Sequence, residues 1–399
     1  MCARASPGRR GRAVRILPDR PSLAFLRKEA KDVLVALRES SPGASLADAQ
    51  RALASEYGMR DWAALKSEVE QRAEETPTAP VGLADSLANA FGLGRVTGSP
   101  APVSYTPTGR SWSITTDRGR WLAGTVLPFI TDAQAEVGAR LRDAAVAAGV
   151  AAPTPVRSPH GRLIEPVQGQ SWRVQEWIEV GPAPMIPVPA AVARRAGRTL
   201  GTLHSLAIPS DSPINSYLIS RRPEAAWWAL LDEARAAHKP WAEQLGEVVP
   251  TLDLRAIEPA IDDSDVILCN LVLNPENVRM GHDDVLVVTD WDLTGSLTPE
   301  LQVGSALTHW ALQPSINRPA IAALRDGYVQ AAGRWPTLGL ASFATAVTGY
   351  LNWTYQTICA AMNSADPDHV AFAERESVDL LKRPMTRSSL HELLAAVDG

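Results

Sequence analysis

The sequence predicts an α+β fold with two lobes, a small antiparallel β lobe followed by a helical large lobe, and a small all-α unit in front of them. Three observations support this prediction. Short segments of alternating apolar residues gather between residues 85 and 180. From residue 189 onward, apolar residues recur mostly at 3- and 4-residue spacing, which is typical of helices. Residues 22–73 show the same helical spacing, and a Pro- and Thr-containing stretch separates them from the rest.

The N-terminal part divides into a tail, a helical module and a linker. Residues 1–20 are basic and lack the 7–15-residue apolar core of a secretory signal, so we expect a disordered basic tail. Residues 21–75 form the module. It contains a first amphipathic helix, a second helix from Leu46 that ends at Gly58, and a third helix capped by Asp61. Residues 76–84 are the linker.

Residues 85–180 are expected to form the small β lobe. Trp112, Ile114 and Thr116 alternate, a tight turn follows at 118–119, and the apolar pattern then resumes, which predicts a β-hairpin. A helix is expected over 133–149 and a further strand over 172–178.

Residues 181–390 are expected to form the helical large lobe. One short buried strand, residues 285–289, interrupts it and ends at Asp290. The expected helices cover residues 192–206, 223–246, 299–313, 317–332, 340–363 and 368–381.

Composition excludes several classes of protein. The net charge of −5 gives no general attraction to nucleic acid, and no apolar run approaches the ~20 residues that span a bilayer. Three cysteines, Cys2, Cys269 and Cys359, are too few and too scattered for a disulfide framework or a zinc site. We therefore expect a cytoplasmic protein that binds neither nucleic acid nor membrane.

The most informative motif lies in residues 267–292. Asn270-Leu271-Val272-Leu273-Asn274-Pro275-Glu276-Asn277 is followed by an apolar strand and by Asp290-Trp291, 13 residues beyond Asn277. This segment resembles the aminoglycoside phosphotransferase and choline kinase family, whose pattern is HxDxxxxN, an apolar strand and then (I/V)DW. The resemblance covers about residues 85–385, and it includes Leu200–Leu206 (LGTLHSL) and the turn at 149–155. It implies a bilobal protein-kinase-like fold.

The resemblance also implies roles for individual residues. Asn277 and Asp290 match the residues that hold Mg²⁺ in the family, and ATP or GTP would be the nucleotide. The hinge strand Glu176-Trp177-Ile178 would contact this nucleotide in the cleft between the lobes. Glu136 matches the helix glutamate that normally pairs with a phosphate-binding lysine. A small molecule would be the other ligand.

Two groups that the chemistry needs are missing from these positions. Val272 stands at the catalytic aspartate position, and Asn270 stands where the family has histidine. The position of the phosphate-binding lysine falls on Ala123 or Gly124. The sequence thus predicts a remnant of a catalytic loop, with the metal ligands kept and the base and the cation lost.

Three hypotheses about function follow. The first is a catalytically impaired phosphotransferase-like protein that binds a nucleotide or small molecule in the interlobe cleft. The second is an active ATP- and Mg²⁺-dependent small-molecule O-phosphotransferase with rewired catalytic residues. The third is a scaffold acting through residues 21–75, whose LRKEAKDVL and LADAQRALASEYGMRDWAALK segments resemble a short helical module at bacterial N-termini and could recruit a protein partner.

Overall fold

The computed structural model describes residues 23–40, 43–74, 78–106, 109–252, 256–313, 315–382 and 385–398. The basic tail expected for residues 1–20 lies outside this part of the chain. The chain divides into two compact units, Met1–Pro77 and Thr78–Gly399, and each is considered by itself. Among the described helices, none combines the length and the apolar character that crossing a bilayer requires.

The first unit contains three helices with a core of their own, α1 (Leu23–Ser40), α2 (Leu46–Glu56) and α3 (Trp62–Glu74). The three helices expected from the sequence are confirmed. Asp61 caps α3 by accepting a hydrogen bond from the Ala64 amide at 2.8 Å, and Gly58 adopts φ 70° just beyond α2, a conformation that glycine takes without strain. The buried core residues are Leu26, Ala30, Leu53, Ala54, Tyr57, Leu65 and Val69.

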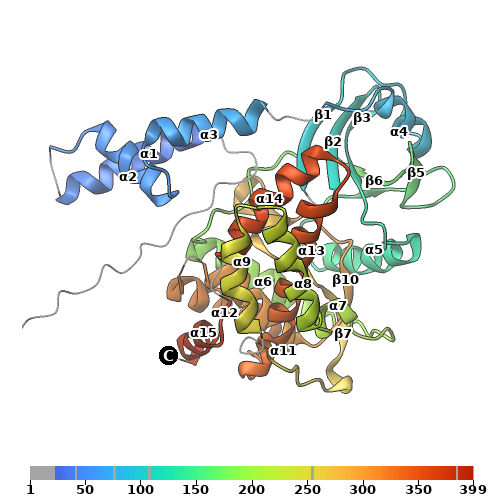
Figure 1. Ribbon diagram of the computed structural model, residues 1–399. Helices are drawn as coiled ribbons and strands as arrows, with labels where there is room; N and C mark the ends of the chain where they lie inside the picture. The colour runs from blue at the N-terminus through green and yellow to red at the C-terminus, as the bar shows by residue number, and fades with distance from the viewer. Residues whose placement is uncertain are drawn as a thin grey trace, which may run out of the picture. The chain divides into compact units, whose positions relative to one another are not determined.

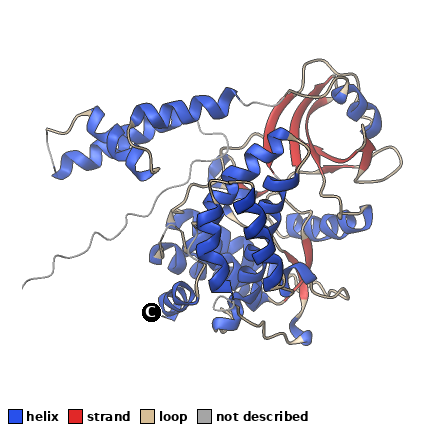
Figure 2. Cartoon of the chain, in the orientation of Figure 1, coloured by secondary structure: helices blue, strands red, loops and turns tan. Residues whose placement is uncertain are grey.

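The second unit begins with a small lobe built around an antiparallel sheet (Figures 1 and 2). The strand order is β1-β2-β3-β6-β4, and β5 pairs with β6. The expected hairpin is confirmed, because β2 and β3 pair around a turn at residues 117–118. The strands are β1 (Ala101–Thr106), β2 (Gly109–Thr116), β3 (Gly119–Thr125), β4 (Pro155–Val156), β5 (Glu165–Val167) and β6 (Gln170–Glu176).

One face of this sheet is covered by α4 (Leu83–Phe91). Side chains that alternate along the strands pack against this helix, namely Trp112, Ile114, Ala123, Trp172 and Val174. Helix α4 was not predicted, and residues 83 and 84 were assigned to a linker. The signal was present, because Leu83, Leu87 and Phe91 recur at four-residue spacing and are all buried.

Helix α5 (Asp132–Ala147) packs against the large lobe. Thr131 caps its N-terminus through the Gln134 amide at 3.2 Å. A Cβ added at Gly138 would lie 2.3 Å from the carbonyl oxygen of Trp291, so glycine allows this close approach of helix and chain. Helix α5 is thereby held against the segment that follows Asp290.

The large lobe is mostly helical. Its helices are α6 (Ala190–Ser205), α7 (Ser216–Ile219), α8 (Glu224–Ala236), α9 (Ala242–Val248), α11 (Pro299–Ala311), α12 (Arg318–Ala332), α13 (Ala344–Asn363), α14 (Pro367–Leu381) and α15 (Arg387–Asp398). The single helix expected over 223–246 was wrong, since α8 and α9 are separate. Between them His238 has φ 51°, which a right-handed helix does not allow, and Pro240 follows, which cannot donate a helical hydrogen bond. Helix α15 was not predicted.

Two short antiparallel pairs of strands interrupt the helices and contain most of the motif in residues 267–292. β7 (Ile267–Asn270) pairs with β10 (Thr294–Leu297), and β8 (Val278–Met280) pairs with β9 (Leu286–Val288). The strand expected over 285–289 is confirmed as β9.

Backbone hydrogen bonds connect this region to the small lobe and to the segment that follows β6. The Val288 amide donates to the Ala151 carbonyl at 2.9 Å, and the Gly181 amide donates to the Met280 carbonyl at 2.7 Å. Farther along the chain, Arg110 at the start of β2 forms an ion pair with Asp366, just before α14. The two lobes therefore meet through several contacts that are far apart in the sequence.

The close pairing of α6 with α12 generates a stability prediction. A Cβ at Gly197 would lie 1.9 Å from the carbonyl oxygen of Leu324. We expect Gly197→Ala to lower the free energy of unfolding by about 1–3 kcal/mol, because the two helices must separate to admit the methyl group. Chemical denaturation followed by tryptophan fluorescence measures this loss.

The matched control is Gly339→Ala, since a Cβ at Gly339 meets nothing within 4 Å. That variant should unfold like the wild type. Equal stability of Gly197→Ala and the wild type would show that the helices are not packed this closely.

Candidate functional site

Residues 270–277 form a loop that ends beside the segment carrying Asp290. The carbonyl oxygen of Asn277 accepts hydrogen bonds from the Thr289 amide at 3.0 Å and from the Thr289 hydroxyl at 2.9 Å. Thr289 directly precedes Asp290. The structure thus brings together the two segments that carry the expected metal ligands, Asn277 and Asp290.

Asn270 fastens the other end of the loop to the same place. Its side chain is fully buried; Nδ2 donates to the Asp290 carbonyl at 2.7 Å, and Oδ1 accepts from the Val272 amide at 3.0 Å. An amide side chain can make both bonds at once because it carries a donor and an acceptor. Asn270 therefore fixes the position of the loop through the two hydrogen bonds of its side chain.

Val272 lies at the turn of the loop and is held by its backbone. Its carbonyl oxygen accepts from Asn277 Nδ2 at 3.0 Å and from the Asn274 amide at 2.8 Å. Because the side-chain Nδ2 of Asn277 donates here, its side-chain oxygen, Oδ1, is the atom suited to a metal ion. The half-buried Val272 side chain offers no proton acceptor.

A buried polar chain supports the loop from beneath. Gln302 on α11 donates from Nε2 to the Asn270 carbonyl, so its Oε1 must accept from His204 Nε2, 2.7 Å away. His204 Nδ1 then accepts from the Tyr328 hydroxyl at 2.8 Å. This pattern requires a neutral imidazole protonated at Nε2. In agreement, burial lowers the pKa of His204 to about 4, against a smaller opposing effect of the Gln302 hydrogen bond.

The expected hinge residues lie at the end of β6. Glu176 donates its amide to the Thr154 carbonyl at 2.9 Å, and the Trp177 amide donates to the Arg120 carbonyl at 3.1 Å. The Arg120 guanidinium stacks 3.7 Å from the centre of the Trp177 ring. The Trp177 indole is thus occupied by a small-lobe side chain, while Ile178 beside it is half-buried.

The structure places Glu136 differently from the role expected for it. Both of its carboxylate oxygens bind Arg157, one of them at 2.8 Å, at a partly exposed position on α5. This pairing lowers the pKa of Glu136, chiefly through the Arg157 hydrogen bond. Glu136 therefore pairs with Arg157, a cation that follows β4, and not with a side chain from β3.

Arg173, which was not among the predicted site residues, stands beside Gly124, one of the two residues on which the lysine position falls. Gly124 on β3 and Arg173 on β6 are direct partners in the antiparallel register. Arg173 Nε lies 3.0 Å from Asp292 Oδ2, and Arg173 Nη2 lies 3.9 Å from Asp290 Oδ1. Alternation with the buried Trp172 and Val174 could have shown which face Arg173 takes, but sequence alone does not give the register.

Charge and burial oppose each other in this group. Burial disfavours the charge of Arg173, but Asp292 and Asp290 outweigh it and raise its pKa. Burial also raises the pKa of Asp292, with Arg173 acting against this and Asp290 adding to it. A cavity of about 50 Å³ adjoins Arg173 and Asp292, and Ala135, Gly138 and Ala139 of α5 line its other side.

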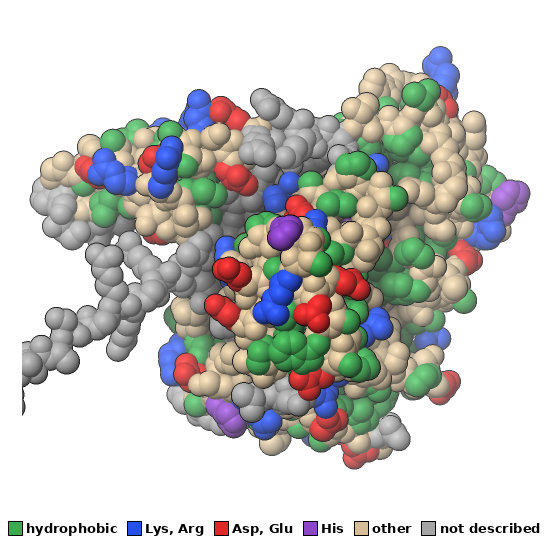
Figure 3. Space-filling view, viewed as in Figure 1, with side chains coloured by type: hydrophobic (Ala, Val, Ile, Leu, Met, Phe, Trp, Pro, Cys, Tyr) green, Lys and Arg blue, Asp and Glu red, His purple; other side chains and the backbone are tan. Residues whose placement is uncertain are grey.

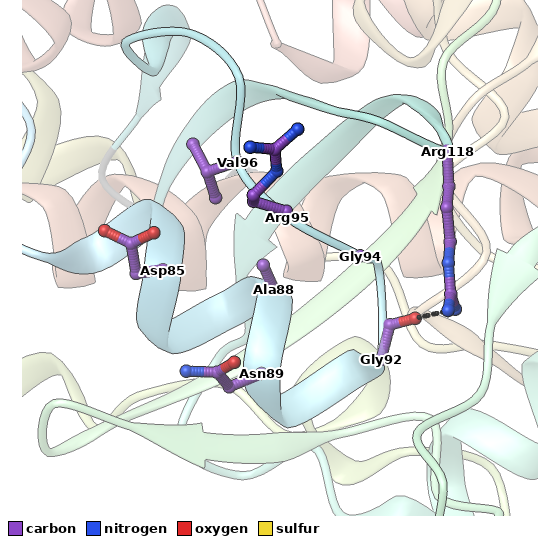
Figure 4. A pocket seen from close by; sticks show the side chains of 8 residues that line it. All are labelled: Asp85, Ala88, Asn89, Gly92, Gly94, Arg95, Val96 and Arg118. Carbon is purple, nitrogen blue, oxygen red and sulfur yellow. Dashed lines mark hydrogen bonds between the residues drawn. The ribbon is translucent and has the colours of Figure 1, made fainter.

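A larger hollow lies elsewhere on the small lobe. It measures about 450 Å³ and lies between α4, residues 92–96 and Arg118. Figure 4 shows Arg118 at one side, where it donates to the Gly92 carbonyl at 3.1 Å. Neither the 270–277 loop nor Asp290 contributes to it.

The surface over α8 and α9 carries acidic and basic side chains side by side on the face seen in Figure 3.

The comparisons with known proteins agree with this fold. The model of the phosphotransferase enzyme family matches residues 108–341. Among solved structures, a spectinomycin phosphotransferase in complex with ADP and spectinomycin is 11% identical, covers 81% of this chain and 99% of its own, and has a TM-score of 0.55. An amicoumacin kinase in complex with AMP-PNP, Ca²⁺ and Ami is 12% identical, with coverages of 81% and 99% and a TM-score of 0.52. No curated protein sequence matches the chain. These likenesses show the expected protein-kinase-like fold.

The buried His204 generates a pH prediction. In the unfolded chain His204 takes up a proton below its ordinary pKa of 6.5, whereas in the folded protein it stays neutral down to about pH 4. The unfolded state therefore binds more protons in this window, and the free energy of unfolding falls as the pH is lowered from 6.5 to 4. His204 should account for a loss of up to about 3 kcal/mol.

Denaturation at a series of pH values tests this. His204→Gln should remove that part of the pH dependence, and His391→Gln, at an exposed position on α15, should leave it in place. An unchanged pH dependence in His204→Gln would contradict the neutral, buried imidazole.

Proposed function

The chain belongs to the phosphotransferase enzyme family, and we propose that it binds a nucleotide with a divalent metal ion between its lobes but transfers phosphoryl groups slowly. The observation that carries this proposal is the loop itself. Hydrogen bonds hold the side chains of Asn277 in the loop and of Asp290 beside it, and these support the proposed metal ligands, while Val272 stands where an acceptor hydroxyl needs a base. The similar structures that hold ADP, or AMP-PNP with Ca²⁺, support the same choice of ligand.

The residues present suit Mg²⁺. This ion prefers oxygen ligands and, in nucleotide complexes, takes one or two from the protein and the others from phosphates and water. Asn277 supplies an amide oxygen. Asp290 supplies a carboxylate, of which Oδ1 accepts from the Asp292 amide at 3.0 Å. When bound, the ion would neutralise negative charge on the phosphates. The chain's own part is to hold these two ligands on neighbouring segments.

The missing base limits catalysis. Removing a general base typically lowers the rate by ~10²–10⁴-fold. Two other carboxylates occur near the position of the missing base, those of Glu276 within the loop and Asp265 just before β7, and both residues are exposed. Positioning and electrostatics contribute much of the barrier reduction in phosphoryl transfer, so a slow reaction remains compatible with Val272.

A second candidate function is a working small-molecule phosphotransferase with rewired residues. One observation favours it, namely that a cation, Arg173, stands beside the lysine position and beside Asp290. The substrate would then be a small hydroxylated molecule, the class represented by spectinomycin in the similar enzyme. The two functions share nucleotide binding and differ in the rate of turnover.

Nucleotide binding is tested by thermal denaturation with ATP or GTP, with and without Mg²⁺. A ligand at 100 times its Kd stabilises the folded state by about 2.7 kcal/mol, so a clear rise of the Tm is expected. Asp290→Asn should remove the additional rise that Mg²⁺ brings, because it takes away the carboxylate. Asp326→Asn, an exposed change on α12, should keep it. Failure of both nucleotides to stabilise the wild type at millimolar concentration would refute the proposed function.

A further inference from the structure

The strand register places Arg173 where it can replace a side chain that β3 lacks. Gly124 and Arg173 are paired across β3 and β6, and paired residues in an antiparallel sheet project to the same face. Their neighbours Ala123 and Val174 pack toward α4, so Gly124 and Arg173 lie on the opposite face. A long side chain from either residue would therefore extend from neighbouring positions on the same face of the sheet.

The contacts of Arg173 cross from the small lobe to the segment after β9. Its Nε forms an ion pair with Asp292 Oδ2 at 3.0 Å, and Nη2 lies 3.9 Å from Asp290 Oδ1. The Arg173 side chain is still 29% exposed, against 18% for Asp292. A guanidinium has five N–H donors, so the ion pair with Asp292 leaves donors for another acceptor.

Phosphoryl-transfer sites of this kind need a cation on the nucleotide phosphates and a carboxylate that orients it. The described part of α5 offers no such carboxylate at the cavity, since Ala135, Gly138 and Ala139 line it and Glu136 binds Arg157 instead. Asp292 provides the carboxylate from another segment. Cation and partner are thus both present, each on a different element from the one expected.

We propose that Arg173 is the phosphate-binding cation of this protein and that Asp292 orients it. The arginine takes the place of the lysine missing from β3, and its free N–H groups bind the phosphates of a nucleoside di- or triphosphate. This inference rests on the proposed nucleotide binding. Asp290, whose Oδ1 lies 3.9 Å from Arg173 Nη2, stays available as a metal ligand.

Affinities for adenosine, ADP and ATP, each measured by calorimetry with Mg²⁺ present, test the inference. Wild type should bind ATP and ADP more tightly than adenosine. Arg173→Gln should weaken ATP binding by about 10- to 100-fold, the range for a lost hydrogen bond to a charged group, and should leave adenosine binding unchanged. Arg173→Lys should keep most of the preference for ATP.

Returning the cation to β3 is the matched rescue. A Cβ at Gly124 meets only Ser111 Cβ, at 3.8 Å, so the backbone at this position admits the side chain of Gly124→Lys. The double variant Gly124→Lys/Arg173→Gln should regain part of the ATP preference. If Arg173→Gln alone fails to fold, the double variant restores a cation to Asp290 and Asp292 and permits the same comparison. Equal affinities for ATP and adenosine in that variant would then count against the inference.

The outcomes separate this inference from the proposed function. No ATP binding by the wild type refutes nucleotide binding itself. ATP binding by the wild type with undiminished ATP binding by Arg173→Gln overturns only the role of Arg173. Equal losses of ATP and adenosine affinity in Arg173→Gln would also overturn it, because they would show that the arginine merely joins the two lobes.

Discussion

The site depends on one constraint, the hydrogen bonding that locks the 270–277 loop against the end of β9. Asn270 bonds the Asp290 backbone at one end of the loop, and Thr289 bonds the Asn277 backbone at the other. The groups involved are buried or half-buried, and leaving one of them unsatisfied costs about 1–3 kcal/mol. The loop conformation is therefore maintained by interactions that do not involve the side chain of residue 272. This explains how a valine can occupy the position of a catalytic aspartate while the surrounding geometry persists.

The same separation between framework and chemistry extends below the loop. Tyr328, His204 and Gln302 form a chain of hydrogen bonds that ends at the Asn270 backbone carbonyl, and this chain fixes the tautomer of the histidine and the orientation of the Gln302 amide. A histidine in this position is structural, since both of its ring nitrogens are already engaged. Above the loop, Arg173 and Asp292 bring opposite charges beside Gly124, where β3 carries no lysine, while Glu136 on α5 pairs with Arg157.

Much of this architecture could be predicted from sequence, because it is written in local spacing. The β2–β3 turn, the helices of the large lobe and the interval from Asn277 to Asp290 all follow from periodicity and motif. Helix α4 was missed although its spacing was readable, and the break between α8 and α9 was overlooked beside Pro240. The cation could not be found, because the pairing of Gly124 with Arg173 depends on strand register, which is set by the whole sheet. The recruiting role of residues 21–75 stays a prediction.

We propose that residue 272 deprives the site of a base, while the hydrogen bonds of the loop would hold a base at this position. The rate of ADP formation from ATP and Mg²⁺, with water as the acceptor, tests this in the wild type, Val272→Asp and Val272→Asn. The aspartate variant should be about 100-fold faster than the wild type, in line with the usual contribution of a general base. The asparagine variant, which cannot accept the proton, should stay at the wild-type rate. A wild type as fast as Val272→Asp would contradict the account.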